Sequence, residues 1–244
     1  MSEALNKVRG VRELPLFPLP LVLFPGAPLP LHVFEPRYQQ MLKDVQVGAN
    51  MFGVSYFDAS ESDDDDDGGG GGGGEQRPPV GQAGCVAEVV EAQPLEDGRS
   101  NVLTLGLIRY EIESYVDTDE PYLIARVSFF EDEEEDAELL RNRAREVTKL
   151  FLRIARAVRT INNERAGLPD LPEAEPERLS FLVASAMEME PDQKQELLEM
   201  RSTALRLNRL QSLLAQAVTN YEERARVHGI AKTNGHADKK LDLQ

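Results

Sequence analysis

Apolar residues alternate with prolines from Leu14 to Phe34, and this pattern predicts extended chain. Proline lacks the backbone N–H that a helix or a central strand requires, so such a stretch suits a sheet edge or a barrel corner. Pro25-Gly26 predicts a turn, with proline at the first central position and glycine at the second. A short helix is expected to begin at Pro36. The face that it should bury carries Tyr38, Met41, Leu42 and Val45.

Alternating patterns predict further strands on both sides of a polar segment. The first covers residues 50–57, and the pattern resumes over 85–93, 102–116 and 122–130. The intervening segment, 58–82, contains an aspartate run and then seven consecutive glycines. This composition predicts a disordered acidic and glycine-rich loop that joins two strands of one domain.

The apolar period lengthens to about 3.5 residues after the strands, which predicts helices. One stripe of a long helix carries Leu140, Ala144, Val147, Phe151, Ile154, Val158 and Ile161. Shorter helices are expected over 177–187 and 191–199, and a last helix carries Leu207, Leu210, Leu214, Val218, Tyr221 and Ala225. The pattern therefore predicts an α+β protein.

Three parts are expected along the chain. Residues 1–130 should form a β-rich part that contains the loop 58–82, residues 131–227 a helical part, and residues 228–244 a flexible tail.

Composition adds the expectation of a folded, cytoplasmic protein. With 244 residues and 41% apolar content, the chain can bury a sizeable core. Prolines interrupt its most apolar stretch and the N-terminus shows no secretory signal, so neither a membrane span nor secretion is expected. The net charge of −16 would repel nucleic acid and anionic membranes if it were spread evenly, but it comes largely from two acidic tracts, 63–67 and 131–136. We expect neither a membrane nor nucleic acid as a partner.

Four segments give the chain a resemblance to a known family. Residues 13–38 read ELPLFPLPLVLFPGAPLPLHVFEPRY, in which prolines, a glycine and aromatic residues fall in a fixed order. Weaker matches are Gly84–Val90, the strand Val102–Ile112 with its Gly106-x-x-Arg109 segment, and Asp192–Met200. Together they resemble the N-terminal substrate-binding domain of Lon proteases, in particular its small stand-alone versions.

This resemblance implies a PUA-like β pseudobarrel followed by a C-terminal helical bundle. It implies a non-catalytic module that binds exposed apolar or flexible polypeptide segments in protein quality control, with a protease or chaperone system as a further partner. Within the matched motif, it places Glu35, Arg37 and Tyr38 in the substrate-binding site. The acidic and glycine tract is longer than the family usually carries in this loop.

Catalytic motifs of full-length Lon do not occur in the sequence. There is no Gly-x-x-x-x-Gly-Lys-Ser/Thr loop to hold nucleotide phosphates, and no serine flanked by Pro-Lys-Asp-Gly and Ala-Gly. We therefore expect no catalytic residues, no cofactor and no metal ion. An undetected hydrolase stays open as an alternative, because a triad assembled in space leaves no fixed sequence motif.

His32 and Cys85 are the residues whose types suggest metal or thiol chemistry. His32 lies in an apolar strand without a second histidine nearby, and Cys85 is the single cysteine of the chain. We expect a packed or hydrogen-bonded histidine and a structural thiol.

Basic residues on the long helix support a rival hypothesis, an RNA-binding PUA-like module that uses residues 141–159. Arg141, Arg145, Lys149 and Arg153 repeat every four residues. Aromatic residues are not interleaved with them as in single-strand binders, and the chain is acidic overall. Pairing with the chain's own acidic C-terminal helices is therefore favoured over RNA binding.

Overall fold

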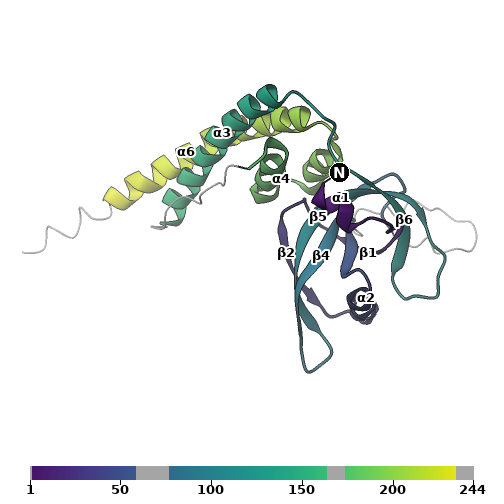
Figure 1. The fold of residues 1–244 in the computed structure, drawn as a ribbon. Helices are drawn as coiled ribbons and strands as arrows, with labels where there is room; N and C mark the ends of the chain where they lie inside the picture. The colour runs from purple at the N-terminus through teal and green to yellow at the C-terminus, as the bar shows by residue number, and fades with distance from the viewer. Residues whose placement is uncertain (1, 59–76, 164–173, 235–244) are drawn as a thin grey trace, which may run out of the picture. The chain divides into compact units, whose positions relative to one another are not determined.

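The computed structural model describes residues 2–58, 77–163 and 174–234. Figure 1 shows the course of the chain through a set of strands and a set of helices. The chain divides into two compact units, which we call the barrel unit and the helical unit. The barrel unit comprises Met1–Asp132 and Ala184–Arg201, and the helical unit comprises Glu133–Val183 and Ser202–Gln244.

Within the described residues, six strands form a mixed sheet that curls into a near-barrel. They are β1 (Glu13–Leu19), β2 (Pro28–Val33), β3 (Met51–Tyr56), β4 (Ala83–Pro94), β5 (Ser100–Tyr115) and β6 (Leu123–Phe130). Their order is β2-β5-β4-β3-β1-β6, with an additional pairing of β5 and β6. The β1–β3 pair is parallel and the other pairs are antiparallel.

The length of β5 allows the barrel to close. One edge of β5 pairs with β4, while its other edge pairs first with β2, over residues 100–105, and then with β6, over residues 109–115. The ring therefore runs through β5, β4, β3, β1 and β6. The second edge of β2 has no neighbour among the described strands and is the open edge of the sheet.

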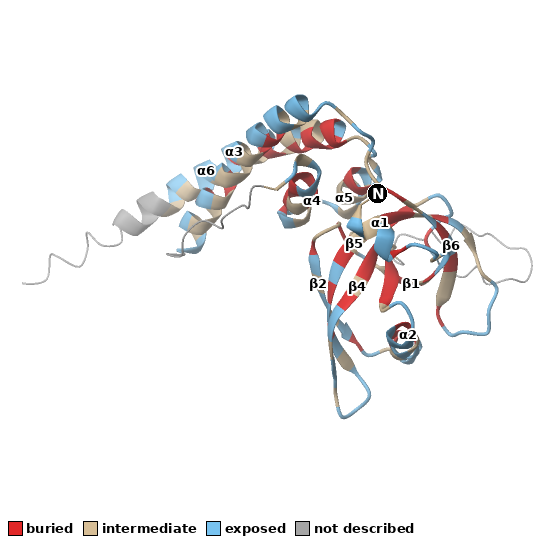
Figure 2. Ribbon diagram, viewed as in Figure 1, coloured by how far each residue is buried: buried red, intermediate tan, exposed pale blue. Residues whose placement is uncertain are grey.

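Apolar side chains fill the barrel and surround one buried tyrosine. Figure 2 shows buried residues in red along β1, β4 and β5. The core cluster contains Val8, Leu14, Leu16, Met51, Val86, Ile108, Tyr110, Ile112, Ala125 and Val127. The Tyr110 hydroxyl shares a 2.7 Å hydrogen bond with Ser55 Oγ, which satisfies both buried groups. A Cβ at Gly53 would lie 2.6 Å from Tyr110 Oη, so the packing requires glycine there.

The predicted Pro25-Gly26 turn is present between β1 and β2. Gly26 has a φ of +79°, and the N–H of Ala27 donates to the carbonyl of Phe24 over 3.1 Å, as in a type II turn. Gly106 of β5 exchanges backbone hydrogen bonds with the turn, over 2.8 Å to Gly26 and 2.9 Å to Ala27. A side chain at Gly106 would overlap the Phe24 carbonyl, which explains the glycine of the Gly-x-x-Arg segment.

Helices α1 (Glu3–Lys7), α2 (Pro36–Val47) and α5 (Pro191–Glu199) belong to the barrel unit. The apolar face of α2 is buried as predicted, with Tyr38, Met41, Leu42 and Val45 inside. Gln195 of α5 donates through Nε2 to the carbonyl of Ala83 in β4 over 2.9 Å. The short α1 was not predicted, because five residues without a buried side chain leave no periodic pattern.

The helical unit contains α3 (Ala137–Asn162) and α6 (Thr203–Asn234), which lie side by side (Figure 1), and most of α4 (Pro176–Ala186). Asp136 caps α3, since its carboxylate accepts the N–H of Leu139 over 2.7 Å. The predicted stripe faces inward in α3, where Ala144, Val147 and Ile154 are buried and its other members are half-buried.

These elements confirm the predicted α+β class, a β near-barrel followed by helices. Helix α6 continues to Asn234, past residue 227 where the helical part was expected to end. Two other expectations, the disordered loop and the flexible tail, fall largely on residues 59–76 and 235–244, outside the described residues. No helix in the described ranges combines the length and the apolarity that crossing a bilayer requires.

Candidate functional site

Two of the predicted site residues, Glu35 and Arg37, pair with each other at the start of α2. Glu35 occupies the N-cap position, but its side chain makes no capping hydrogen bond. Instead its Oε2 accepts from Arg37 Nε over 3.0 Å and from Nη2 over 2.8 Å. The side chains are 40% and 52% exposed, and such pairs contribute about 1 kcal/mol or less. Another acceptor can therefore replace Glu35 beside Arg37 with little loss of stability.

Tyr38, the third predicted site residue, points inward. It is 5% exposed and packs against Phe17, with ring centroids 4.0 Å apart and the rings tilted by 31°. The Arg37 guanidinium lies 4.6 Å from the centre of the Tyr38 ring. Burial raises the pKa of the Tyr38 phenol, so the ring stays neutral. Tyr38 thus supports the position of Arg37 and presents little surface of its own.

A cavity of about 1030 Å³ lies beside Arg37 and Tyr38, and we call it the α2 cavity. Its walls come from the end of β1, the start of α2, the residues that flank 59–76, and the β5–β6 connection. The aromatic and proline side chains in these walls are Pro18, Pro20, Tyr38, Phe57, Tyr115, Pro121 and Tyr122, and polar, charged and a few aliphatic side chains line the rest. Its volume is at the upper end for ligand pockets, so it has room for more than one side chain.

Two tyrosines in the cavity wall are held through their hydroxyl groups. Tyr115 donates to the carbonyl of Pro78 over 2.6 Å, and the Arg77 guanidinium lies 4.1 Å from the centre of its ring. Tyr122 donates to Asp44 Oδ2 over 2.9 Å. Burial raises the pKa of Tyr115 to about 12, so its hydroxyl remains a donor near neutral pH.

The β5–β6 connection gives the α2 cavity an acidic rim. Asp117 and Glu120 line the cavity, and both are exposed. Neither carboxylate forms a hydrogen bond or an ion pair with another described residue. Thr118 Oγ1 accepts the backbone N–H of Glu120 over 3.3 Å, which helps to fix the rim.

An exposed apolar surface covers parts of β2, β5 and β4. The register places Pro28 opposite Leu105 and Pro30 opposite Leu103, so these side chains share one side of the sheet. Leu103 and Leu105 are 39% and 38% exposed, while Val90, at an irregularity of β4, and Phe34, just after β2, are each 60% exposed. We call these exposed residues, Pro28, Pro30, Phe34, Val90, Leu103 and Leu105, the apolar face; the hydrogen-bonded pair His32 and Asn101 lies between Pro30 and Phe34.

The open edge beside the apolar face lacks hydrogen-bond donors at its prolines. The carbonyl of Ala27 accepts from Gly106 of β5, so alternate residues from Ala27 onward face β5. Pro28 and Pro30 consequently face the open edge, where a residue with an N–H could pair with another strand. Because proline has no N–H, this edge does not template regular strand addition there.

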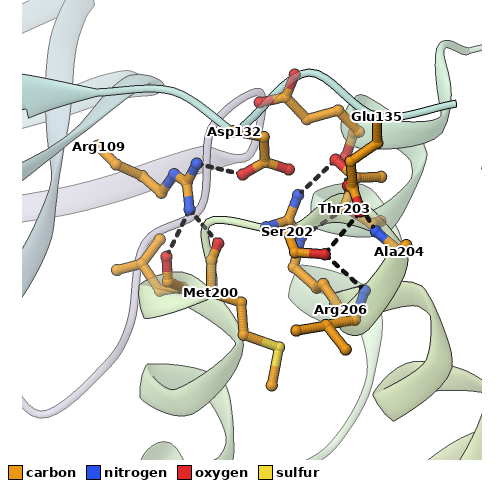
Figure 3. Close-up of polar contacts among 12 residues, drawn as sticks. Arg109, Asp132, Glu135, Met200, Ser202, Thr203, Ala204 and Arg206 are labelled. Atoms are coloured by element: carbon orange, nitrogen blue, oxygen red, sulfur yellow. Dashed lines mark hydrogen bonds and ion pairs between the residues drawn. The ribbon is translucent and has the colours of Figure 1, made fainter.

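Arg109 of the Gly-x-x-Arg segment is a buried arginine that holds three parts of the barrel unit together (Figure 3). It is 1% exposed, and its Nη1 donates to the carbonyls of Leu198 over 2.9 Å and Met200 over 2.6 Å. Nη2 pairs with Asp132, and the guanidinium lies 4.5 Å from the centre of the Phe130 ring. The sequence shows the motif but not this role of Arg109, because the polar partners lie 23 to 91 residues away along the chain.

A second polar cluster in Figure 3 belongs to the helical unit. Glu135 accepts from Ser202 Oγ over 2.8 Å and from the N–H of Ala204 over 3.0 Å, so it caps the first turn of α6. Arg206 is fully buried and donates through Nε to Ser180 Oγ over 2.8 Å. Glu135 and Arg206 therefore have hydrogen-bond partners within the helical unit, and their role there is structural.

The basic stripe of α3 is paired in its middle. Arg153 forms two 2.9 Å hydrogen bonds with Glu222 of α6, and Lys149 pairs with Glu146 over 2.7 Å. Pairing with a C-terminal helix therefore occurs at Arg153, as sequence analysis favoured. Arg141 and Arg156 are exposed and show no side-chain partner in the described ranges.

His32 and Cys85 occupy ordinary environments. His32 Nδ1 lies 2.8 Å from Asn101 Oδ1, and its ring stacks near Phe34 with centroids 6.2 Å apart. Cys85 is buried, and burial raises the pKa of its thiol to about 12, which leaves little reactive thiolate. Across the residues with described positions, no three His, Cys, Asp or Glu side chains gather as metal ligands would.

Comparison with protein families gives a match over residues 13–216 to the ATP-dependent protease La (LON) substrate-binding domain. Lon protease from Syntrophomonas wolfei is 27% identical over 206 residues, which cover 84% of this chain and 24% of that protein. Lon protease 2 from Herpetosiphon aurantiacus is 28% identical over 137 residues, covering 56% and 17%. The chain thus spans about a quarter or less of the length of these relatives.

Solved structures show the same fold. The Lon N-terminal domain protein from Xanthomonas campestris aligns with a TM-score of 0.58 at 21% identity, covering 83% of this chain and 98% of that one. The N-terminal domain of Mycobacterium avium complex Lon protease aligns with a TM-score of 0.62 at 16% identity, covering 84% and 98%.

Proposed function

Because the chain belongs to the family of Lon substrate-binding domains, we propose that it binds exposed apolar or flexible segments of other polypeptides. In this proposal it is a non-catalytic module of cytoplasmic protein quality control, whose partners are unfolded clients and a protease or chaperone system. The observation that carries the proposal is the apolar face, since clustered exposed apolar side chains mark interaction surfaces in folded proteins.

A client segment would lie across the apolar face and contact it through side chains. A groove of about 410 Å³ along Pro30, His32 and Leu103 offers space for them. Backbone pairing with β2 contributes little, because Pro28 and Pro30 offer no N–H at the open edge. This mode suits a module that accepts many sequences, because it reads apolar character and not a fixed register.

Glu35, Arg37 and Tyr38 would form the polar end of the same surface, directly after Phe34 in the chain. Arg37 can exchange its exposed partner Glu35 for a backbone carbonyl of the client, forming a charge-assisted hydrogen bond. The ring of Tyr38 lies against the Arg37 guanidinium and positions it. In this proposal Arg37 makes the contact and Tyr38 positions it.

A double substitution on the apolar face tests the proposal. We expect Phe34→Ser with Leu103→Ser to weaken binding of an unstructured peptide, rich in leucine and phenylalanine, by about tenfold, because two apolar anchors are lost. Fluorescence anisotropy of the labelled peptide measures this change. Arg37→Gln is expected to weaken binding by a smaller factor, since it removes one exposed polar contact.

Val47→Ser is the matched control. Val47 is 91% exposed at the end of α2 and lies outside the apolar face, so its loss removes apolar surface without touching the proposed site. Circular dichroism should show that all variants keep their fold. Unchanged peptide affinity in the folded Phe34→Ser/Leu103→Ser variant contradicts the proposed location.

A further inference from the structure

In the α2 cavity, two arginines of the chain lie over the rings of tyrosines in the wall. Arg77 lies 4.1 Å from the centre of the Tyr115 ring, and Arg37 lies 4.6 Å from the centre of the Tyr38 ring. The face of an aromatic ring carries partial negative charge and attracts guanidinium and ammonium groups. The contacts of Arg37 and Arg77 thus show that tyrosine rings in the cavity wall accept a guanidinium group.

The acidic rim of the cavity also favours cations. Asp117 and Glu120 are exposed at the rim, and neither carboxylate is paired within the described part of the chain. Arg37 pairs with Glu35, so the other charged side chains among the described lining residues are Asp58, Asp117 and Glu120 against Arg77. The cavity therefore keeps an excess of negative charge, which favours cationic ligands.

Aromatic and proline side chains beside exposed carboxylates suit a long basic side chain. Lysine and arginine bury an aliphatic stem against apolar surface and keep the charged end in a polar environment. Proline and aromatic side chains such as Pro18, Phe57 and Pro121 provide the apolar wall, while Asp117 and Glu120 provide acceptors at the rim. An acidic client segment would meet the same rim with repulsion.

We propose that the α2 cavity selects client segments that carry an arginine or lysine next to their apolar residues. The inference rests on the proposed polypeptide-binding function and adds a class of substrate to it. The apolar face would hold the apolar part of the segment, and the cavity would hold its basic side chain between the aromatic walls and the carboxylates of Asp117 and Glu120. Selection among unfolded segments then depends on charge as well as on hydrophobicity.

Three peptides test this inference. They share one unstructured, leucine-containing sequence and carry two arginines, two glutamines or two glutamates at the same positions. We expect the arginine peptide to bind the full chain about threefold to tenfold more tightly than the glutamine peptide, as two exposed ion pairs allow. The preference should shrink at 0.5 M salt, because exposed charge pairs are screened. Fluorescence anisotropy gives the ratio of the two dissociation constants.

Asp117→Asn with Glu120→Gln should bring this ratio close to one. The control, Glu96→Gln with Glu113→Gln, changes the net charge equally at exposed acids outside the α2 cavity and should leave the ratio unchanged. Equal affinity of the wild-type chain for all three peptides overturns the inference and leaves the proposed function standing. The inference is also overturned if Asp117→Asn/Glu120→Gln and the control Glu96→Gln/Glu113→Gln give the same ratio of dissociation constants. If none of the three peptides binds, the proposed function is contradicted as well.

Discussion

Arg109 and Arg37 show how their surroundings give two arginines of one unit different roles. Arg109 is 1% exposed and meets Asp132, two backbone carbonyls and the ring of Phe130. The Arg37 side chain is 52% exposed and pairs with one neighbouring carboxylate. A buried, fully partnered guanidinium holds structure together, whereas an exposed one with a replaceable partner is available for binding.

Replacing Arg109 with methionine should strongly destabilise the barrel unit. The change removes the guanidinium that pairs with the buried Asp132 carboxylate and that donates to the carbonyls of Leu198 and Met200. Breaking a buried pair on one side costs about 3–5 kcal/mol. Urea denaturation followed by circular dichroism measures the loss in free energy of unfolding.

Arg126→Met provides the comparison for this prediction. Arg126 pairs with Glu13 across β6 and β1, but the two side chains are 63% and 47% exposed. An exposed pair contributes about 1 kcal/mol or less, so this variant should unfold close to the wild-type midpoint. If both variants lose a similarly small free energy of unfolding, the contacts of Arg109 do not stabilise the barrel unit as proposed.

Most helices and strands could be predicted because their signals are local. The buried face of α2 and the stripe of α3 follow from apolar spacing, and the helix expected over 191–199 is α5, Pro191–Glu199. The pairing of β5 with both β2 and β6 and the parallel β1–β3 pair could not be predicted. They depend on contacts between distant segments, which leave no periodicity in the sequence.

The candidate site shows the same limit. Arg37 and Tyr38 could be selected from a motif, because they are neighbours in the sequence. The α2 cavity around them draws its walls from segments between Pro18 and Ile124, and its acidic rim lies about 80 residues from Arg37. The inward orientation of Tyr38 also depends on Phe17, a residue distant in the sequence, against which its ring packs.

The open edge of β2 leads to a prediction at the level of the strand. Pro28→Val with Pro30→Val restores two N–H groups at this edge, beside the exposed apolar face. An unprotected apolar edge strand pairs with another copy, so we expect the variant to self-associate at concentrations where the wild-type chain does not. Sedimentation velocity compares the two proteins at equal concentration.

Pro28→Lys with Pro30→Lys separates donor restoration from edge charge. It restores the same N–H groups but adds positive charges that repel a second copy, so it should sediment like the wild-type chain. If the valine variant also sediments like the wild-type chain, the prolines do not protect this edge.

For the whole molecule, the match to a substrate-binding family is consistent with the exposed apolar face and the α2 cavity. The family model covers residues 13–216, which include parts of both units. The apolar face and the α2 cavity lie in the barrel unit, which is therefore the proposed client-binding part. Neither the phosphate loop nor the peptidase motif of full-length Lon occurs in the 244 residues.

Binding of one client protein in two states tests the central claim most directly. The client is used in its native state and after reduction and alkylation of its disulfides, which keeps it unfolded. We predict that the chain binds the unfolded form with a dissociation constant of about 1–100 μM, as weak apolar contacts to a flexible chain allow, and does not bind the native form. Isothermal titration calorimetry measures both. No binding to the unfolded form, or equal binding to both forms, would contradict the account.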